Sequence, residues 1–201
     1  MKKIKEIFIG THNKGKIREI IYLLNRKIKK ITPFDLNIKS PKETGNSFKA
    51  NSELKAKYFF KKSKMMTISD DSGLCVDCLK GEPGIYSARW SKKYGNFNKA
   101  GKKIIQLVEN KNKNKKIKNT KAKFVCSLTF YYNNNKKITT IGIVKGKISD
   151  RLLGKNGFGY DPIFIPNGFS ITYGQMSKRK KILMDHRFLA FRKLKRKINI
   201  L

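Results

Sequence analysis

Two runs of β-branched and aromatic residues dominate the second half of the chain. They cover residues 124–132 and 137–144, and they flank the polar triplet Asn133-Asn134-Asn135. Runs of this composition around a polar tip predict a long β-hairpin. We also expect a strand at residues 163–165, after a loop rich in glycine. A β-sheet therefore forms a large part of the predicted fold.

The start of the chain predicts a strand followed by a helix. Residues 5–10 have the composition of a buried strand, and the apolar stripe of a helix follows at Ile17, Ile20, Ile21 and Leu24. The polar turn 11–16 lies between them, where the first N–H groups of a helix can bind an anion. Phosphate binding is one interpretation of this turn. The other is an ordinary strand-to-helix turn capped by Thr11 or Asn13.

Shorter patterns complete the predicted fold. We expect a strand at residues 31–34, a turn and then a helix within residues 43–60, a helix ending near Asn110, and a C-terminal helix with an apolar face at Ala190, Phe191, Leu194 and Ile198. Residues 80–90 and the Lys- and Asn-rich segment 111–123 are expected to be loops. The chain of 201 residues has no internal repeat. We therefore predict one α/β domain that covers residues 1–201.

The charge of the chain invites a nucleic-acid-binding interpretation. It has 48 Lys and Arg residues against 13 Asp and Glu residues, a formal net charge of +35. Such a protein attracts phosphate backbones through counterion release. The basic residues are nevertheless spread along the whole chain and are mostly Lys, whereas a dedicated binder gathers them on one face. A basic RNA- or DNA-binding protein therefore stays the alternative hypothesis, and weak nonspecific affinity is expected.

The apolar runs and the cysteines indicate the compartment. No apolar run approaches the roughly 20 residues that a membrane-spanning helix needs, and the charged start of the chain does not resemble a signal peptide. The three cysteines, Cys75, Cys78 and Cys126, are too few for a disulfide framework. We expect a soluble cytoplasmic protein, in which the Cys75 and Cys78 pair is structural.

The stretch Ser69-Asp70-Asp71-Ser72-Gly73-Leu74 lies between two short apolar runs. It predicts a turn between two strands that carries two neighbouring carboxylates. Such a pair can hold a divalent cation and orient a water molecule, although Asp, Ser and Gly are also common turn residues. Glu43 could be a third carboxylate on the metal side. It could also be placed to interact with the dipole of the helix that follows.

Two later motifs allow both a functional and a structural interpretation. The glycines on either side of Phe158 let the backbone approach a flat ligand on which the ring stacks, but a core Phe in a tight turn has the same pattern. Lys181, His186 and Arg187 lie near the start of the last helix. Such a group is more often found on a surface than in a site.

The order of these motifs carries the functional prediction. The chain contains Thr-x-Asn-x-x-Lys, Glu-Thr-Gly, Ser-Asp-Asp-Ser-Gly-Leu, Pro-Gly-Ile-Tyr-Ser-Ala-Arg, Gly-Phe-Gly-Tyr-Asp-Pro-x-Phe and a closing Lys followed by His-Arg. Nearly the whole chain thereby resembles the inosine/xanthosine triphosphate pyrophosphatases. The resemblance implies an elongated two-lobed α/β fold, with a highly twisted mixed sheet flanked by helices and a nucleotide cleft between the lobes. It also implies a homodimer and Mg²⁺-dependent hydrolysis of ITP, dITP and XTP to the monophosphate and pyrophosphate.

The resemblance assigns roles residue by residue. It implies that Asp70 accepts the proton of the attacking water and that Asp71 and Glu43 are the metal-side carboxylates. On the phosphate side of the substrate it places Ser72 and the turn Thr11, His12, Asn13, Lys14, Gly15 and Lys16. On the nucleoside side it places Phe158, Gly159, Tyr160 and Asp161. It implies that Lys181, His186 and Arg187 close over the ligand. The chain departs from the family pattern at His12, where Gly is common, and at Asp185, where Ser is usual. It also has Arg179 and Lys180 where acidic residues are frequent.

The chemistry of the purine explains the expected selectivity. Inosine and xanthosine present a keto acceptor at the 6-position, which a donor such as Arg187 can satisfy, whereas adenine presents an amino donor. A buried mismatch of two donors can discriminate strongly. GTP carries the same keto group, so its exclusion requires a further contact at the purine 2-position.

Overall fold

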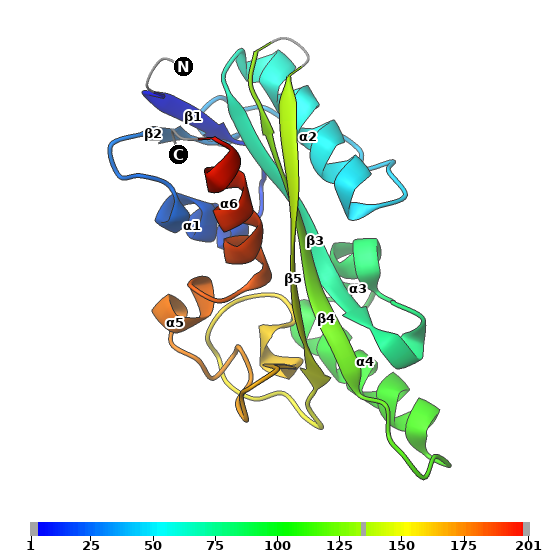
Figure 1. The fold of residues 1–201 in the computed structure, drawn as a ribbon. Helices are drawn as coiled ribbons and strands as arrows, with labels where there is room; N and C mark the ends of the chain where they lie inside the picture. Colours follow the sequence, from blue (N-terminus) through cyan, green and yellow to red (C-terminus); the bar gives the residue numbers. More distant parts are fainter. Residues whose placement is uncertain (1–3, 134–135, 199–201) are drawn as a thin grey trace. The chain divides into compact units, whose positions relative to one another are not determined.

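The computed structural model of the chain contains a mixed six-stranded sheet, and it describes residues 4–133 and 136–198 (Figure 1). The order of the strands in the sheet is β2-β1-β3-β4-β5-β6. β1 pairs in parallel with both β2 and β3, whereas β5 and β6 pair antiparallel. The strands are β1 (Glu6–Ile9), β2 (Lys29–Ile31), β3 (Thr67–Val76), β4 (Lys121–Tyr131), β5 (Lys137–Ile148) and β6 (Phe164–Pro166).

Helices flank this sheet, which confirms the predicted α/β fold class. They are α1 (Lys14–Leu23), α2 (Phe48–Ser63), α3 (Ser87–Lys93), α4 (Phe97–Asn112), α5 (Lys178–Ile182) and α6 (His186–Lys197), with single 3₁₀ turns at Asp77–Leu79, Gly84–Tyr86 and Asp161–Ile163. Within the described part of the chain, no helix is long and apolar enough to cross a membrane.

Most of the sequence-based elements are present. β4 and β5 are neighbours in the sheet, as the hairpin prediction requires, although the expected tip at Asn134 and Asn135 lies outside the described residues. The strand expected at residues 31–34 begins and ends earlier, as β2. The expected loop 80–90 contains a 3₁₀ turn and the start of α3. In the segment 111–123, α4 continues to Asn112, and that side chain bonds to the backbone of Asn119 on both of its polar atoms.

The prediction of a turn at the two neighbouring aspartates is wrong. Asp70 and Asp71 lie inside the ten-residue strand β3, and both are buried. The turn preference of Asp, Ser and Gly is a local tendency, and strand pairing on both sides of β3 overrides it. Gly73 permits a close approach here, because a Cβ atom at this position would collide with the carbonyl oxygen of Gly84 and the hydroxyl of Ser87.

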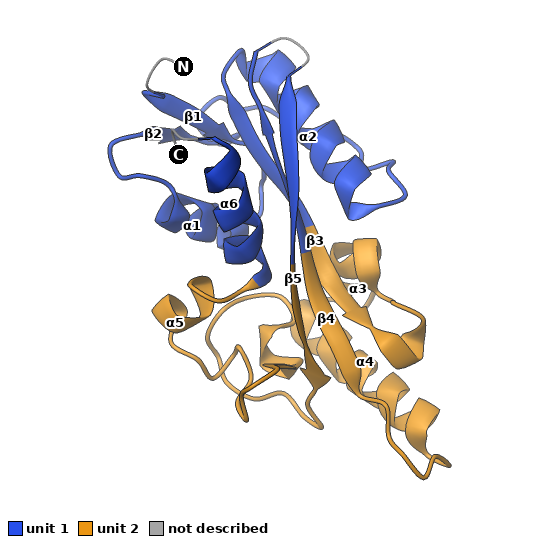
Figure 2. Ribbon diagram, in the orientation of Figure 1, with its two compact units in different colours: residues 1–71, 126–142, 186–201 blue, residues 72–125, 143–185 orange. Residues whose placement is uncertain are grey.

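The chain forms two compact units, coloured blue and orange in Figure 2. Unit 1 comprises residues 1–71, 126–142 and 186–201, and unit 2 comprises residues 72–125 and 143–185. Each unit has its own hydrophobic core. The core of unit 1 includes Ile7, Ile9, Ile20, Ile68, Leu128 and Phe191, and that of unit 2 includes Leu74, Val76, Ile104, Ile163, Phe164 and Tyr173.

A glycine fixes the position of α6 in unit 1. A Cβ atom at Gly142 would collide with the carbonyl oxygen of His186 and the amide nitrogen of Ala190, so only glycine lets β5 come this close to the helix. Thr140, on the same strand, donates a 2.8 Å hydrogen bond from its hydroxyl to the Ala190 carbonyl. These two contacts place the first turn of α6, which contains Arg187.

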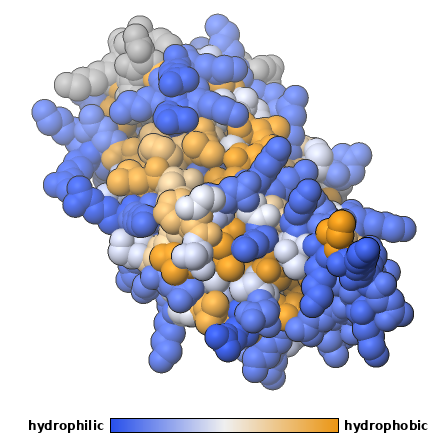
Figure 3. Space-filling view, turned by 60° about the horizontal axis from the view of Figure 1, so that its bottom comes forward, coloured by the Kyte–Doolittle hydropathy of each residue, from blue (hydrophilic) through white to orange (hydrophobic). Residues whose placement is uncertain are grey.

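The surface agrees with a dispersed positive charge. Figure 3 shows one face of the molecule, on which hydrophobic residues gather in the middle and hydrophilic residues surround them. Exposed lysines occur on several helices, for example Lys57 on α2, Lys102 on α4 and Lys193 on α6. The basic residues are therefore not confined to one helix.

Candidate active site

Asp70 is a fully buried carboxylate that faces two cations in unit 1. Its Oδ2 lies 3.1 Å from Lys16 Nζ and 2.8 Å from Arg187 Nη2. Its other oxygen, Oδ1, is buried and has no hydrogen-bond partner among the described residues. Burial would raise the pKa of Asp70, but the charges of Lys16, Arg187 and Lys55 outweigh burial and hold the pKa well below its usual range. Asp70 is thus ionised, and its Oδ1 is enclosed without a hydrogen-bond partner among the described residues.

Asp71 has a different set of partners, contributed by α2. Asn51 Nδ2 donates a hydrogen bond of 3.2 Å to Asp71 Oδ2, and Lys55 Nζ lies 3.4 Å from Asp71 Oδ1. The same ammonium lies 2.5 Å from Glu43 Oε1. Burial raises the pKa of Asp71 above its usual value, against the opposing charges of Lys55 and Lys16. Glu43 and Asp71 therefore lie on either side of one buried lysine.

The strand geometry explains why the two aspartates differ. Successive side chains on a strand point to opposite faces of the sheet. Asp70 accordingly faces Lys16 of α1 and Arg187 of α6, whereas Asp71 faces α2. Figure 1 shows α1 and α6 on one side of β3 and α2 on the other. One pair of neighbouring carboxylates is thereby divided between two chemical environments.

The position of Glu43 tests the helix-dipole interpretation. α2 begins at Phe48 and is capped by Ser47, and its first turn contains no acidic residue. Glu43 instead pairs with Lys55, whose charge outweighs burial and holds the pKa of Glu43 below its usual value. Helix-dipole stabilisation is therefore not the role of Glu43.

The polar turn before α1 is organised around Asn13. Its side chain accepts hydrogen bonds from the amides of Gly15 and Lys16, which makes Asn13 the N-cap of the helix. The Thr11 hydroxyl accepts a bond from the Asn13 amide. The capping interpretation is thus confirmed for Asn13. Capping by Asn13 is compatible with phosphate binding, because it leaves the side chains of Lys14 and Lys16 outside the cap. Lys14 is exposed, and Lys16 points toward Asp70.

His12, one of the departures from the family pattern, joins this turn to the segment before α2. Its Nδ1 lies 2.6 Å from Ser40 Oγ, and its ring packs edge-on against Phe34 at 5.3 Å. The segment 32–47 also contains Glu43. His12 therefore connects the turn before α1 to the segment that contains Glu43.

Lys181 is the centre of the predicted nucleoside side, in unit 2. Its buried ammonium lies 3.3 Å from Asp161 Oδ2 and 3.3 Å from Asp185 Oδ2. It also lies 4.8 Å from the centroid of the Phe158 ring, a cation–π contact. The structure thus brings together Phe158, Asp161 and Lys181. It adds Asp185, the residue that replaces the usual Ser.

The glycine-rich loop has a defined geometry. Gly157 has φ +78°, and a Cβ atom there would collide with the Asp161 carboxylate, which accepts a 2.8 Å hydrogen bond from the Phe158 amide. Tyr160 donates a hydrogen bond to the Ser87 carbonyl, and burial raises its pKa above the usual range. A cavity of about 230 Å³ is lined by this loop and by the start of α4, with Gly157, Phe158 and Gly159 among the lining residues.

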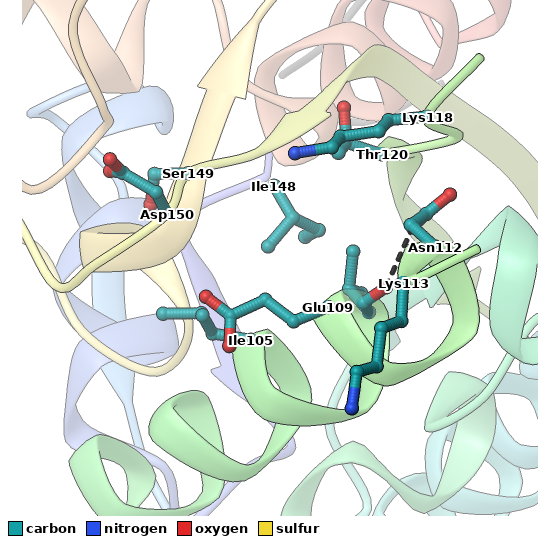
Figure 4. Close-up of a pocket in the computed structure, with 10 residues that line it drawn as sticks. Ile105, Glu109, Asn112, Lys113, Lys118, Thr120, Ile148, Ser149 and Asp150 are labelled. Atoms are coloured by element: carbon teal, nitrogen blue, oxygen red, sulfur yellow. Dashed lines mark hydrogen bonds between the residues drawn. The ribbon is translucent and has the colours of Figure 1, made fainter. Parts of the chain in front are cut away.

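A second cavity, of about 450 Å³, lies elsewhere in unit 2 (Figure 4). Ile105 and Ile148 form part of its apolar floor, and Glu109, Lys118 and Asp150 lie at its rim. None of the predicted site residues lines it. The charged residues at its rim are exposed, and its buried polar residues, Asn112 and Ser149, are uncharged, so it lacks the buried charges of the Asp70 and Lys181 clusters.

The carboxylates of Glu43 and Asp71 are the residues of this site that could hold a divalent cation. Among the residues that the structure describes, no three His, Cys, Asp or Glu side chains gather as a metal site. Mg²⁺, however, is commonly held by one or two carboxylates, with water and substrate phosphates completing its coordination. Glu43 and Asp71 supply two hard oxygen donors joined through one cation. This donor set suits Mg²⁺ better than zinc, which prefers Cys and His.

Sequence reasoning missed three residues of this site. Asn51 and Lys55 lie four residues apart and thus on one face of α2, and that spacing was their only signal. Glu19 is buried in α1 and bonds to Arg187 Nη1, from which it is 168 positions away in the chain. Arg187 itself is fully buried and donates to both Asp70 and Glu19. Its contact with a purine therefore stays a prediction, as does the contact of His186.

Comparisons with known proteins point to one family. The sequence profile of the Ham1 family matches residues 7–197. The chain is 40% identical over 193 residues to the dITP/XTP pyrophosphatase of Dictyoglomus thermophilum, with 94% of this chain and 92% of that protein covered. It is 37% identical to the dITP/XTP pyrophosphatase of Caulobacter vibrioides, with 94% and 96% covered. The solved structure of a HAM1 protein from Coxiella burnetii superposes with a TM-score of 0.86 at 28% identity, with 98% and 99% covered.

Proposed function

The chain belongs to the Ham1 family, and from this membership we propose that it hydrolyses the deaminated purine nucleotides dITP, ITP and XTP to the monophosphate and pyrophosphate. Three observations support the proposal: the length of the match to dITP/XTP pyrophosphatases, the buried Asp70 and Asp71 clusters, and the aromatic and charged group around Lys181. Such an enzyme clears these nucleotides before they enter DNA or RNA.

The observation that carries the proposal is the separation of Asp70 from Asp71. Hydrolysis of the bond between the α and β phosphorus requires a water molecule in line with the leaving pyrophosphate, together with positive charge on the phosphate oxygens. Asp70 Oδ1 is proposed to bind and deprotonate that water, and its lack of a hydrogen-bond partner among the described residues supports this role. Asp71 faces Glu43 through Lys55, so it can serve the metal without competing for the water.

The phosphate side is proposed to be the turn 11–16. Lys16 pairs with Asp70 Oδ2 in this structure, and the anionic triphosphate competes for its ammonium. Loss of this pair removes the largest charge that lowers the pKa of Asp70, which makes the carboxylate a better base when substrate is bound. Thr11, Asn13 and Ser72 are proposed to contact the same phosphates.

The metal is proposed to be Mg²⁺, held by Glu43 and Asp71. When bound, it neutralises charge on the phosphate oxygens and on the leaving pyrophosphate. Asn51 orients Asp71 for this role through its hydrogen bond to Oδ2, and it accepts a 2.8 Å hydrogen bond from the Gly45 amide. It thereby also fixes the segment next to Glu43.

The base is proposed to lie against Phe158, beside Lys181 and Asp161. Arg187 is proposed as the donor to the 6-keto oxygen. Because its guanidinium donates to Asp70 and Glu19 here, it reaches a purine only by giving up some of these bonds. Substrate binding would then relieve Asp70 of a second cation.

The experiment that tests this function is a substrate panel. Purified protein with Mg²⁺ should release pyrophosphate from ITP, dITP and XTP far faster than from ATP or GTP. Asp70→Asn should slow release by at least about 100-fold, the scale of a lost general base, and should still bind the nucleotide. Asp150→Asn, at an exposed position, is the matched control. Equal rates on all five nucleotides would remove the assignment.

Other properties follow from the same proposal. Residues 1–201 are proposed to act as one pyrophosphatase domain in the cytoplasm, as a homodimer. The charge of +35 is proposed to give only nonspecific affinity for nucleic acid. Binding to RNA should therefore weaken steeply between low and physiological salt and show no preferred sequence. Tight, selective binding at physiological salt would favour the alternative of a dedicated RNA- or DNA-binding protein.

A further inference from the structure

Lys55 lies where two negative charges converge. Its ammonium is 2.5 Å from Glu43 Oε1 and 3.4 Å from Asp71 Oδ1, and its side chain is only 8% exposed. These two carboxylates are the proposed metal ligands. A protein cation thus stands between the groups that are to share a magnesium ion.

This ammonium has a clear physical effect. Two carboxylates that approach each other in a buried place repel one another, and an intervening positive charge removes most of that cost. Lysine suits the task because its ammonium is a compact charge on a flexible four-carbon chain, which can move away without a change in the backbone. Asn51 holds Asp71 independently, through Oδ2, so the carboxylate does not depend on Lys55 for its orientation.

The same position opposes a bare metal ion. Mg²⁺ binds oxygen at about 2.0–2.1 Å. A divalent cation on the Glu43 and Asp71 oxygens would therefore lie within a few ångströms of the Lys55 ammonium. The two positive charges would repel each other strongly at this distance in a buried site. The ammonium must therefore move when the metal binds, and a triphosphate is an anion that can receive it.

We propose that Lys55 is a resident counter-ion of the metal-side carboxylates, which a magnesium–nucleotide complex displaces and which a bare divalent cation does not displace easily. This inference rests on the proposed function for the identity of the metal ligands. In this proposal Lys55 acts before the hydrolysis step. Its ammonium keeps the two carboxylates in place and makes metal binding depend on the nucleotide.

The test measures Mn²⁺ binding without nucleotide, by electron paramagnetic resonance of the unbound ion. Lys55→Met keeps the length of the side chain and removes its charge, and Lys57→Met is the matched control at an exposed position of the same helix. Lys55→Met should bind Mn²⁺ at least about tenfold more tightly than the wild type, a change of about 1.4 kcal/mol. The control should bind as the wild type does. Unchanged or weaker binding by Lys55→Met would overturn the proposal.

A double variant and a measurement with a nucleotide analogue test the proposal independently of the first experiment. Glu43→Gln added to Lys55→Met should abolish the gain, because the new affinity belongs to the carboxylate pair. Should Lys55→Met fold poorly, Lys55→Gln takes its place. In the wild type, a non-hydrolysable α,β-methylene analogue of ITP should raise the affinity for Mn²⁺ by at least about tenfold. If the analogue does not raise the affinity of the wild type for Mn²⁺, the proposal is contradicted, regardless of the Mn²⁺ affinities of the variants.

The outcome also separates this proposal from the proposed function. A wild type that releases pyrophosphate from ITP, combined with a Lys55→Met variant that gains no Mn²⁺ affinity, refutes the counter-ion role alone. A gain of Mn²⁺ affinity in a protein that does not hydrolyse ITP refutes the substrate assignment alone.

Discussion

Arg187 Nη2 lies 2.8 Å from Asp70 Oδ2, and neither side chain is exposed to solvent. The same guanidinium donates from Nη1 to Glu19, so one buried cation serves two buried carboxylates. Arg187, 117 positions after Asp70 in the chain, thereby contributes to the charge environment of the proposed catalytic base, together with Lys16.

Removal of this cation should destabilise the fold. Arg187→Ala leaves Asp70 and Glu19 buried with one positive partner fewer, and loss of one member of a buried ion pair costs about 3–5 kcal/mol. We expect a decrease of this size in the free energy of unfolding, measured by urea denaturation. Lys195→Ala, at an exposed site on the same helix, should change it by less than about 0.5 kcal/mol. An equal decrease in the free energy of unfolding for Arg187→Ala and Lys195→Ala would show that the buried ion pairs of Arg187 add no stability of their own.

The orientation of Asp71 should affect metal affinity. Asn51→Leu keeps most of the side-chain volume but removes the hydrogen bonds to Asp71 and from Gly45. Hydrogen-bond partners of metal ligands typically contribute about 10- to 100-fold in affinity. We expect the Mg²⁺ concentration for half-maximal pyrophosphate release to rise by about this factor. Asn110→Leu, exposed on α4, is the control, and an unchanged Mg²⁺ dependence in Asn51→Leu would contradict the role.

Asp185 should influence the choice of base. Asp185→Ser restores the residue usual in the family and removes one of two carboxylates that face Lys181. Lys181 then has a larger net positive field, which favours xanthine, since xanthine has one more keto acceptor than hypoxanthine. The ratio of kcat/KM for XTP to that for ITP should rise several-fold. Asp150→Ser should leave the ratio unchanged, and a fall in the ratio for Asp185→Ser would reject this role.

Acid should abolish the contribution of Glu53 to stability. Burial would raise the pKa of Glu53, but hydrogen bonds from Lys137 and Thr139 hold it below its usual value. A carboxylate with a lowered pKa in the folded state stabilises the fold above its unfolded pKa, and the effect disappears as the pH falls through the folded pKa. Glu53→Gln should therefore be less stable than the wild type in urea at pH 7.

The difference between the wild type and Glu53→Gln should shrink toward pH 3, below the usual pKa of a Glu side chain, about 4.3. Glu109→Gln, at an exposed position, provides the comparison. A difference that stays constant from pH 7 to pH 3 would mean that Glu53 contributes through packing and not through its charge.

Local patterns predicted most elements of the fold. The stripe from Ile17 to Leu24 identified α1, and the β-branched runs identified β4 and β5. The turn predicted at the aspartate pair is wrong because local residue preferences carry no information about the sheet partners of β3. Assigned to a strand, Asp70 and Asp71 would have been expected on opposite faces from the two-residue period alone.

The missed site residues had weaker signals. Lys55 is one lysine in a chain in which Lys and Arg total 48, so its residue type carries almost no information. Glu19 and Arg187 meet only in the folded chain, since they are 168 positions apart. In contrast, Phe158, Asp161 and Lys181 were identified by the order of motifs, and the structure brings them together.

The division of the chain into units has a consequence for its folding. Unit 1 ends its first segment at Asp71, and its last segment begins at His186. A ribosome therefore releases the buried carboxylates of Asp70 and Glu19 long before it releases Arg187, and it synthesises most of unit 2 in between. Contacts so distant in sequence form late, after the entropy of a long loop has been lost. Unit 1 is thus expected to fold fully only after the segment that begins at His186 has been synthesised, and a chain truncated before residue 186 should be degraded readily by proteases.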